Sequence, residues 1–93
     1  MHNNPAIGIL GAGAWGTTIA KLLSDKNSDV LLWAKEPQVK KGVEKTRINE
    51  IYLDKIKLNK SLKITNHLED LSELDILFIV VPTQYIQSTL RPL

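Results

Sequence analysis

The sequence contains no cysteine, and aromatic residues make up only 5% of it. Without cysteine, neither a disulfide framework nor a cysteine-ligated metal site can form. Long apolar runs are also missing: the run near the N-terminus is short and broken by glycines, and no basic segment precedes it. Such a run cannot serve as a signal peptide or cross a membrane. We therefore expect a cytoplasmic protein with no membrane span.

The charge balance of the sequence excludes fewer functions than the missing cysteines and apolar runs do. The formal net charge is +2 and the isoelectric point is near 9.0, and much of the excess comes from lysines scattered through the middle of the chain. A small excess of this kind suits an anionic ligand and does not indicate nucleic acid. With 43% hydrophobic and 24% charged residues, the composition is that of a globular chain, and 93 residues allow one domain at most.

Glycine is concentrated where an apolar run gives way to a helical pattern. The run Ala6–Leu10 is followed by Gly11, Gly13 and Gly16, which form a G-x-G-x-x-G motif. In a dinucleotide site the first glycine allows the sharp turn out of a strand, the second lets a pyrophosphate approach the backbone, and the third lets the new helix pack closely. The helix N-terminus that follows favours an anion. The alternative is a glycine-rich turn that binds nothing.

The hydrophobic pattern predicts alternating strands and helices. Trp15, Ile19, Leu22 and Leu23 form one helical stripe, which we expect to face a sheet. Residues 49–61 have no clear period and are predicted to be an ordered loop. A weak helical stretch at 67–74 has Leu68, Leu71 and Leu74 on one face. The predicted strands are 6–10, 30–34, 62–65 and 76–81, and the predicted helices are 15–24, 37–45 and one starting at 85–90.

This alternation indicates an α/β fold with a parallel, doubly wound sheet and right-handed crossovers. The expected strand order is 3-2-1-4, which reverses between the first and fourth strands and opens a crevice at their carboxyl ends. Gly11 lies at one lip of that crevice, and Pro82, Thr83 and Gln84 lie at the other. Two stretches distant in sequence therefore converge on one candidate site.

The end of the second strand bears on the choice of cofactor. In this kind of fold an acid there bonds the ribose 2′-hydroxyl of NAD, whereas a basic side chain accepts the 2′-phosphate of NADP. The chain has both, Lys35 and Glu36. Both can also be ordinary solvated charges, and the residues leave the choice open.

Three motifs resemble NAD(P)-dependent glycerol-3-phosphate dehydrogenase of the bacterial type. The first is Gly-Ala-Gly-Ala-Trp-Gly-Thr at 11–17, the second is Asn-Glu-Ile-Tyr-Leu at 49–53 followed by Ile-Lys-Leu at 56–58, and the third is Val-Val-Pro-Thr-Gln at 80–84. Trp33, after an aliphatic strand, also matches. The resemblance spans nearly the whole chain. It departs at Asp54 and Asn59, where the family has proline, and at Ala14, where many members have serine.

The resemblance implies a C-terminally truncated Rossmann domain over residues 1–93, the cofactor-binding part of an oxidoreductase. Its reaction interconverts dihydroxyacetone phosphate and sn-glycerol 3-phosphate with NAD(P)H and feeds glycerophospholipid synthesis. The family's catalytic lysines fall beyond Leu93, so no catalytic residue is assigned and the chain alone is expected to be inactive. The full enzyme is expected to be a homodimer. The chain alone is expected to self-associate through its exposed, apolar fourth strand.

Some candidate cofactor contacts have a structural alternative. Trp15 can be core packing, Tyr52 can be a loop residue at the sheet edge, and Pro82 can simply end the fourth strand. Two alternatives to a glycerol-3-phosphate dehydrogenase stay open. One is a stand-alone NAD(P)-binding or sensing module, and the other is a different dehydrogenase of the same superfamily that acts on a hydroxy acid. The second and third motifs argue against the latter. The candidate cofactor-binding residues are Gly11, Gly13, Ala14, Trp15, Gly16, Lys35, Glu36, Tyr52 and Pro82.

Overall fold

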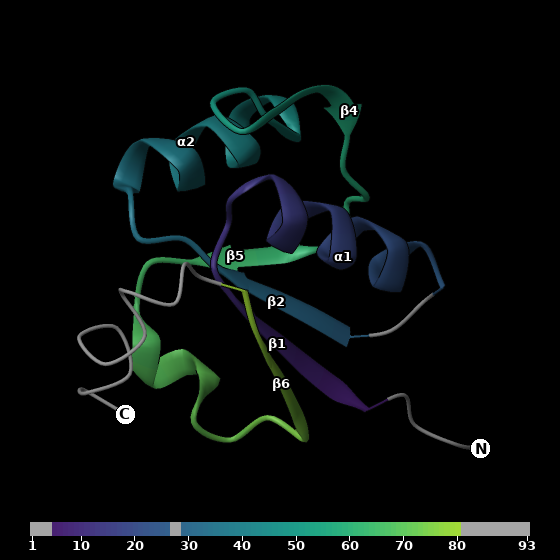
Figure 1. The fold of residues 1–93 in the computed structure, drawn as a ribbon, viewed down its shortest axis with the longest axis vertical. Coiled ribbons are helices and arrows are strands. Elements are labelled where there is room, and N and C mark those ends of the chain that lie inside the picture. The colour runs from purple at the N-terminus through teal and green to yellow at the C-terminus, as the bar shows by residue number, and fades with distance from the viewer. Residues whose placement is uncertain (1–4, 27–28, 81–93) are drawn as a thin grey trace.

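The fold was analysed in a computed structural model that describes residues 5–26 and 29–80 (Figure 1). Strands and helices alternate through most of this part of the chain. In chain order the elements are β1 (Ala6–Leu10), α1 (Ala14–Asp25), β2 (Asp29–Trp33), α2 (Pro37–Thr46), β3 (Ile48–Asn49), β4 (Leu53–Lys57), β5 (Lys63–Thr65), the 3-10 helix η1 (Leu68–Leu71) and β6 (Ile76–Ile79).

The main sheet is parallel and has the order β5-β2-β1-β6. These strands correspond to the third, second, first and fourth predicted strands, so the predicted α/β class and 3-2-1-4 order are confirmed. In register, Leu10 lies between Trp33 of β2 and Ile79 of β6. The carboxyl ends of β1, β2 and β6 therefore meet at one edge, where the strand order reverses.

Two apolar clusters cover the two faces of the sheet. The larger one joins β1, β2 and β5 to α1 and α2, with Ile9, Leu32 and Val43 almost fully buried. The smaller one packs Leu10 and Trp33 against Leu71 of η1, with Leu68 and Leu74 beside it. The three leucines pack together as predicted, but the helical stretch expected over 67–74 is a 3-10 helix of four residues, and Leu74 lies outside it. Figure 1 shows α1 and α2 on one side of the strands and η1 on the other, as in a doubly wound sheet.

The face of α1 that packs on the sheet differs from the prediction. Ile19 and Leu23 pack against the larger cluster, but Trp15 is 76% exposed and Leu22 is also exposed. The buried positions are instead the small residues Gly16, Thr17, Ala20 and Ser24. Small side chains let the helix approach the sheet closely, and this turns the two large apolar residues towards the surface. The predicted four-residue stripe is therefore wrong at Trp15 and Leu22.

The segment predicted as a loop at 49–61 contains β-structure. β3 and β4 pair antiparallel, with a register irregularity at Ile48 and Asn49. Residues 54–57 of β4 are all exposed, so no alternation of apolar and polar residues marks the strand. Lys55 also has a positive φ of 71°. The β3–β4 hairpin lies beside α2, above the main sheet (Figure 1).

The remaining differences concern the ends of elements. β2 is shifted by one residue from its predicted bounds, β5 begins one residue later than predicted, and β6 ends at Ile79, before Val80. Pro82, Thr83 and the helix expected from residue 85 lie outside the described residues. β6 forms an edge of the sheet, and all four of its residues are exposed. Among the residues that the structure describes, no helix is long and apolar enough to cross a membrane.

Candidate functional site

The turn between β1 and α1 leaves no room for side chains at two of its glycines. Gly11 has a φ of 124°, a conformation that L side chains rarely adopt. A Cβ placed on Gly16 would lie 1.7 Å from the carbonyl oxygen of Gly11. The first and last glycines of the motif are thus needed to bring the start of the helix back onto the strand.

Gly13 differs because the space beside it is open. A Cβ built there would meet nothing within 4 Å, and its φ of −74° is an ordinary one. No packing or backbone requirement for glycine appears at this position. A ligand that approaches the backbone here would give a reason for the missing side chain.

Gly13 is also the N-cap of α1, and no side chain caps the helix there. The backbone N–H of Thr17 donates to the Gly13 carbonyl at 3.0 Å and begins the helical ladder. The preceding N–H groups, at Ala14, Trp15 and Gly16, precede that ladder and have no carbonyl one turn back to bind. The first turn carries no acidic residue. The turn therefore offers unneutralised donors and a positive helix end to an anion.

A buried asparagine from the hairpin braces this turn. The Asn49 side-chain amide is 1% exposed and donates to the carbonyl of Ala12 and to Oγ1 of Thr17, both at 2.8 Å. The Thr17 hydroxyl donates to the same carbonyl at 3.2 Å. The glycine turn is thus held from a segment 37 residues away. Asn49 and Thr17 both lie in motifs of the sequence, but neither motif predicted this bracing role.

The end of β2 forms a second group of candidate residues. Lys35 is exposed, and Glu36 is half-buried at the N-cap of α2, where Pro37 follows. The Tyr52 hydroxyl donates to both carboxylate oxygens of Glu36, at 3.0 and 2.8 Å. The Asn66 side-chain amide donates to the carbonyls of Ala34 and Glu36, at 2.7 and 3.3 Å.

These contacts have an electrostatic consequence for Tyr52. Its hydroxyl hydrogen bond to the Glu36 carboxylate, with smaller contributions from burial and from the carboxylate charge, raises the pKa of Tyr52 above its ordinary value. The phenol therefore stays protonated and keeps donating to Glu36 throughout the neutral range. Asn66 was not among the predicted residues, and no sequence motif marked it.

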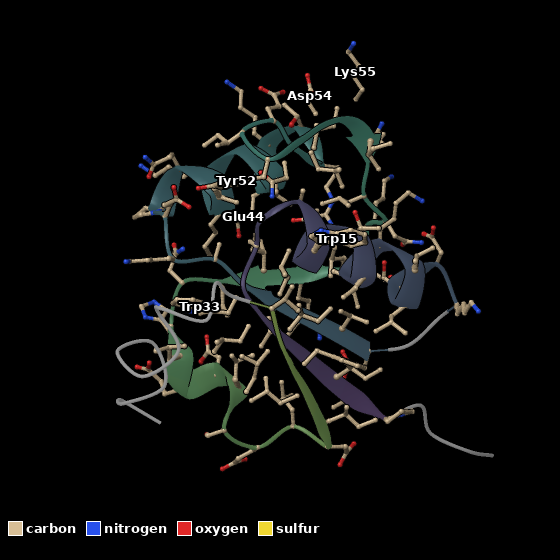
Figure 2. All side chains as sticks on the ribbon, in the orientation of Figure 1. Trp15, Trp33, Glu44, Tyr52, Asp54 and Lys55 are labelled. Carbon is tan, nitrogen blue, oxygen red and sulfur yellow. The ribbon has the colours of Figure 1, made fainter. Side chains whose placement is uncertain are left out.

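The two tryptophans lie in different environments. Trp15 is exposed in the first turn of α1, which excludes the alternative that it serves only as core packing. Trp33 is buried in the smaller cluster, and its Nε1 has no hydrogen-bond partner among the described residues. Figure 2 shows Trp33 apart from Trp15, on the other side of the strands.

The structure thus brings most of the predicted site residues into two groups. Gly11, Gly13, Ala14, Trp15 and Gly16 form the turn, and Lys35, Glu36 and Tyr52 lie at the end of β2, with the hairpin reaching both. Pro82 lies outside the described residues. The chain does follow β1 to its carboxyl end just after β6, because the Val80 N–H donates to the Leu10 carbonyl at 2.9 Å. The described residues contain no cluster of three or more histidine, aspartate or glutamate side chains able to hold a metal.

Comparisons with known proteins agree with this geometry. The family described as NAD-dependent glycerol-3-phosphate dehydrogenase N-terminus matches residues 6–93. A glycerol-3-phosphate dehydrogenase (NAD(P)+) of Hyphomonas neptunium is 43% identical over 86 residues, which are 92% of this chain and 26% of the relative. The enzyme of the same name from Geobacter metallireducens is 43% identical over 88 residues, 94% of this chain and 26% of the relative.

Solved structures give the same result. The crystal structure of glycerol-3-phosphate dehydrogenase from Coxiella burnetii superposes with a TM-score of 0.83 at 31% identity, over 97% of this chain and 29% of that one. The Plasmodium falciparum enzyme superposes with a TM-score of 0.86 at 26% identity, over 97% of this chain and 28% of that one. The chain spans about a quarter of the length of the curated relatives that it matches.

Proposed function

Because the chain belongs to the family of the N-terminal part of NAD-dependent glycerol-3-phosphate dehydrogenase, we propose that it binds NAD(H) or NADP(H). Residues 1–93 are proposed to form a cofactor-binding domain of Rossmann type. The pyrophosphate would lie at the N-terminus of α1 and the adenosine end beside the carboxyl end of β2. This placement follows the switch point of the strand order.

The observation that carries this proposal is the contrast among the three glycines of the motif. Gly11 and Gly16 are required by the turn itself, whereas Gly13 has open space where its side chain would be. The same stretch is the uncapped positive end of a helix. A dinucleotide pyrophosphate combines the negative charge and the close approach that such a turn accommodates.

Each candidate residue has a proposed role. The N–H groups of Ala14, Trp15 and Gly16 would donate to phosphate oxygens, and Gly11 and Gly13 would shape the turn. Lys35 and Glu36 would lie at the adenosine ribose, with Tyr52 beside them. For Pro82, we propose a contact near the ribose on the nicotinamide side.

A bound nicotinamide supplies or accepts the hydride, and this chain's residues bind and orient it. The relatives' names support the reaction, which we propose to be the interconversion of dihydroxyacetone phosphate and sn-glycerol 3-phosphate, feeding glycerophospholipid synthesis. The chain would contribute the cofactor-binding part of this oxidoreductase. A cytoplasmic location and a homodimeric full-length enzyme remain proposals; fractionation of cells and sedimentation of the full-length enzyme test them.

Isothermal titration calorimetry of the purified chain with NADH and NADPH tests the binding. Gly13→Val places a side chain where the pyrophosphate would lie, and we expect at least a tenfold loss of affinity with folding unchanged by circular dichroism. Gly42→Val is the matched control, because Gly42 in α2 also has open space beside it. Equal binding by the two variants, or no binding by the folded wild-type chain, contradicts the proposal.

A further inference from the structure

The β3–β4 hairpin touches both groups of the candidate site. Asn49 holds the glycine turn through its side-chain amide, and Tyr52 holds Glu36 through its hydroxyl. The two residues are also joined, because the Tyr52 backbone N–H donates to Oδ1 of Asn49 at 3.3 Å. One four-residue segment therefore fixes the turn that would receive the pyrophosphate and the acid that would face the ribose.

Glu36 and Lys35 differ in how firmly they are held. The Glu36 carboxylate accepts the Tyr52 hydroxyl on both oxygens, and its backbone carbonyl accepts from Asn66. Lys35 is exposed, and its side chain makes no hydrogen bond or ion pair with the described residues. A ligand that uses Glu36 meets a group already in place, whereas one that uses Lys35 must first order a long side chain.

A carboxylate bound to one phenol keeps lone pairs for further donors. The hydroxyls of an unmodified ribose can donate to those lone pairs. A 2′-phosphate has only acceptor oxygens at neutral pH and carries negative charge, so a carboxylate that cannot swing away repels it. Tyr52 limits that movement, and its effect on selectivity would pass through Glu36.

We propose that Tyr52 is a positioning residue that makes the site prefer NADH to NADPH by holding the Glu36 carboxylate in place. This inference rests on the proposed function and deepens it, because it names the cofactor and the residue pair that selects it. Tyr52 itself need not touch the ribose.

A double-mutant cycle on the affinities of NADH and NADPH tests the inference. The variants are Tyr52→Phe, which removes only the hydroxyl, Glu36→Gln, and the two together. We expect wild type to favour NADH and Tyr52→Phe to reduce the ratio of the two affinities about three- to tenfold. In the Glu36→Gln background the same tyrosine change is expected to leave the ratio unaltered.

Glu44→Gln is the matched control for charge, because it removes an acid from α2 that pairs with Lys40 and not with Tyr52. We expect it to leave the ratio as in wild type. Three results would each overturn this inference and leave the proposed function standing. They are a preference of wild type for NADPH, an unchanged affinity ratio in Tyr52→Phe, and an equal effect of that change with and without Glu36. Failure of the folded wild-type chain to bind either nucleotide overturns the proposed function as well.

Discussion

Gly16 is the position in the turn with the least room for a side chain. The nearest atom to an added Cβ is the backbone oxygen of Gly11, which cannot rotate away as a side chain can. We expect Gly16→Ala to lower the free energy of unfolding by about 3 kcal/mol, because relieving the clash requires the turn to open. Urea unfolding followed by circular dichroism measures this.

Gly42→Ala is the control for that substitution. Gly42 is helical and unobstructed, so alanine there is expected to raise stability by about 0.5–1 kcal/mol. Equal effects of the two alanine substitutions would show that the close approach at Gly16 does not matter to folding.

Asn49 is a buried polar residue whose hydrogen bonds are all internal. Replacing it with alanine removes the donor shared by Ala12 and Thr17 and leaves a buried carbonyl with fewer partners. We expect a loss of about 1–3 kcal/mol in the free energy of unfolding. Asn59→Ala serves as the control, since Asn59 is exposed. A loss no larger than that of the control would refute the bracing role.

We expect the hydrogen bond from Tyr52 to Glu36 to make the stability of the fold depend on pH. The pKa of Tyr52 is raised in the folded chain. The hydrogen bond therefore contributes its full stability at pH values below the ordinary tyrosine pKa of 10.0. That contribution is lost as the pH rises through the folded-state pKa. The phenolate absorbance of wild type minus that of Tyr52→Phe gives the midpoint. A midpoint at or below the ordinary value contradicts the hydrogen bond.

Among the elements, the buried strands were predictable and the hairpin was not. Val30, Leu32 and their neighbours form an uninterrupted apolar run because both faces of a central parallel strand are covered. β4 has neither face buried along residues 54–57, so its pattern carries no strand signal. Its bracing of the glycine turn depends on a contact that no local pattern encodes.

The stripe on α1 failed for a different physical reason. The prediction took the face with the large apolar side chains as the buried one. This helix instead approaches its sheet through small residues such as Gly16 and Ala20. Trp15 and Leu22 are left exposed. Motif spacing predicted the glycine turn correctly because each glycine position follows from the shape of the turn. It could not reveal that Tyr52 bonds Glu36.

β6 is the element that carries the prediction of self-association. It is an edge strand whose four apolar residues are all exposed, and such edges pair with other chains. We expect sedimentation velocity to show concentration-dependent association of the isolated chain. Phe78→Lys is expected to weaken it, because a charge on the edge opposes pairing.

Ile51→Lys is the matched control for the edge, since Ile51 is also an exposed apolar residue but lies in the hairpin. It is expected to leave the association unchanged. A clean monomer at high concentration, or the same effect from both lysine substitutions, would rule out the β6 edge as the contact.

For the molecule as a whole, the order of the strands brings the two groups of candidate residues to the same edge of the sheet. β1 lies centrally, so the turn that follows it is next to the ends of both β2 and β6. The hairpin, which the sequence did not predict, joins the turn to the end of β2. We therefore expect a dinucleotide to lie across this edge, with its pyrophosphate on the glycine turn.

Glycine-selective 15N labelling tests this placement of the pyrophosphate, because the chain has five glycines and therefore five amide signals. Gly11, Gly13 and Gly16 lie in the turn, while Gly8 in β1 and Gly42 in α2 are internal controls. On addition of NADH, we expect the three turn signals to shift, those of Gly13 and Gly16 most, while the two control signals stay in place. Saturable binding that leaves the turn signals unmoved, or that shifts Gly42 as much as Gly13, would contradict this placement.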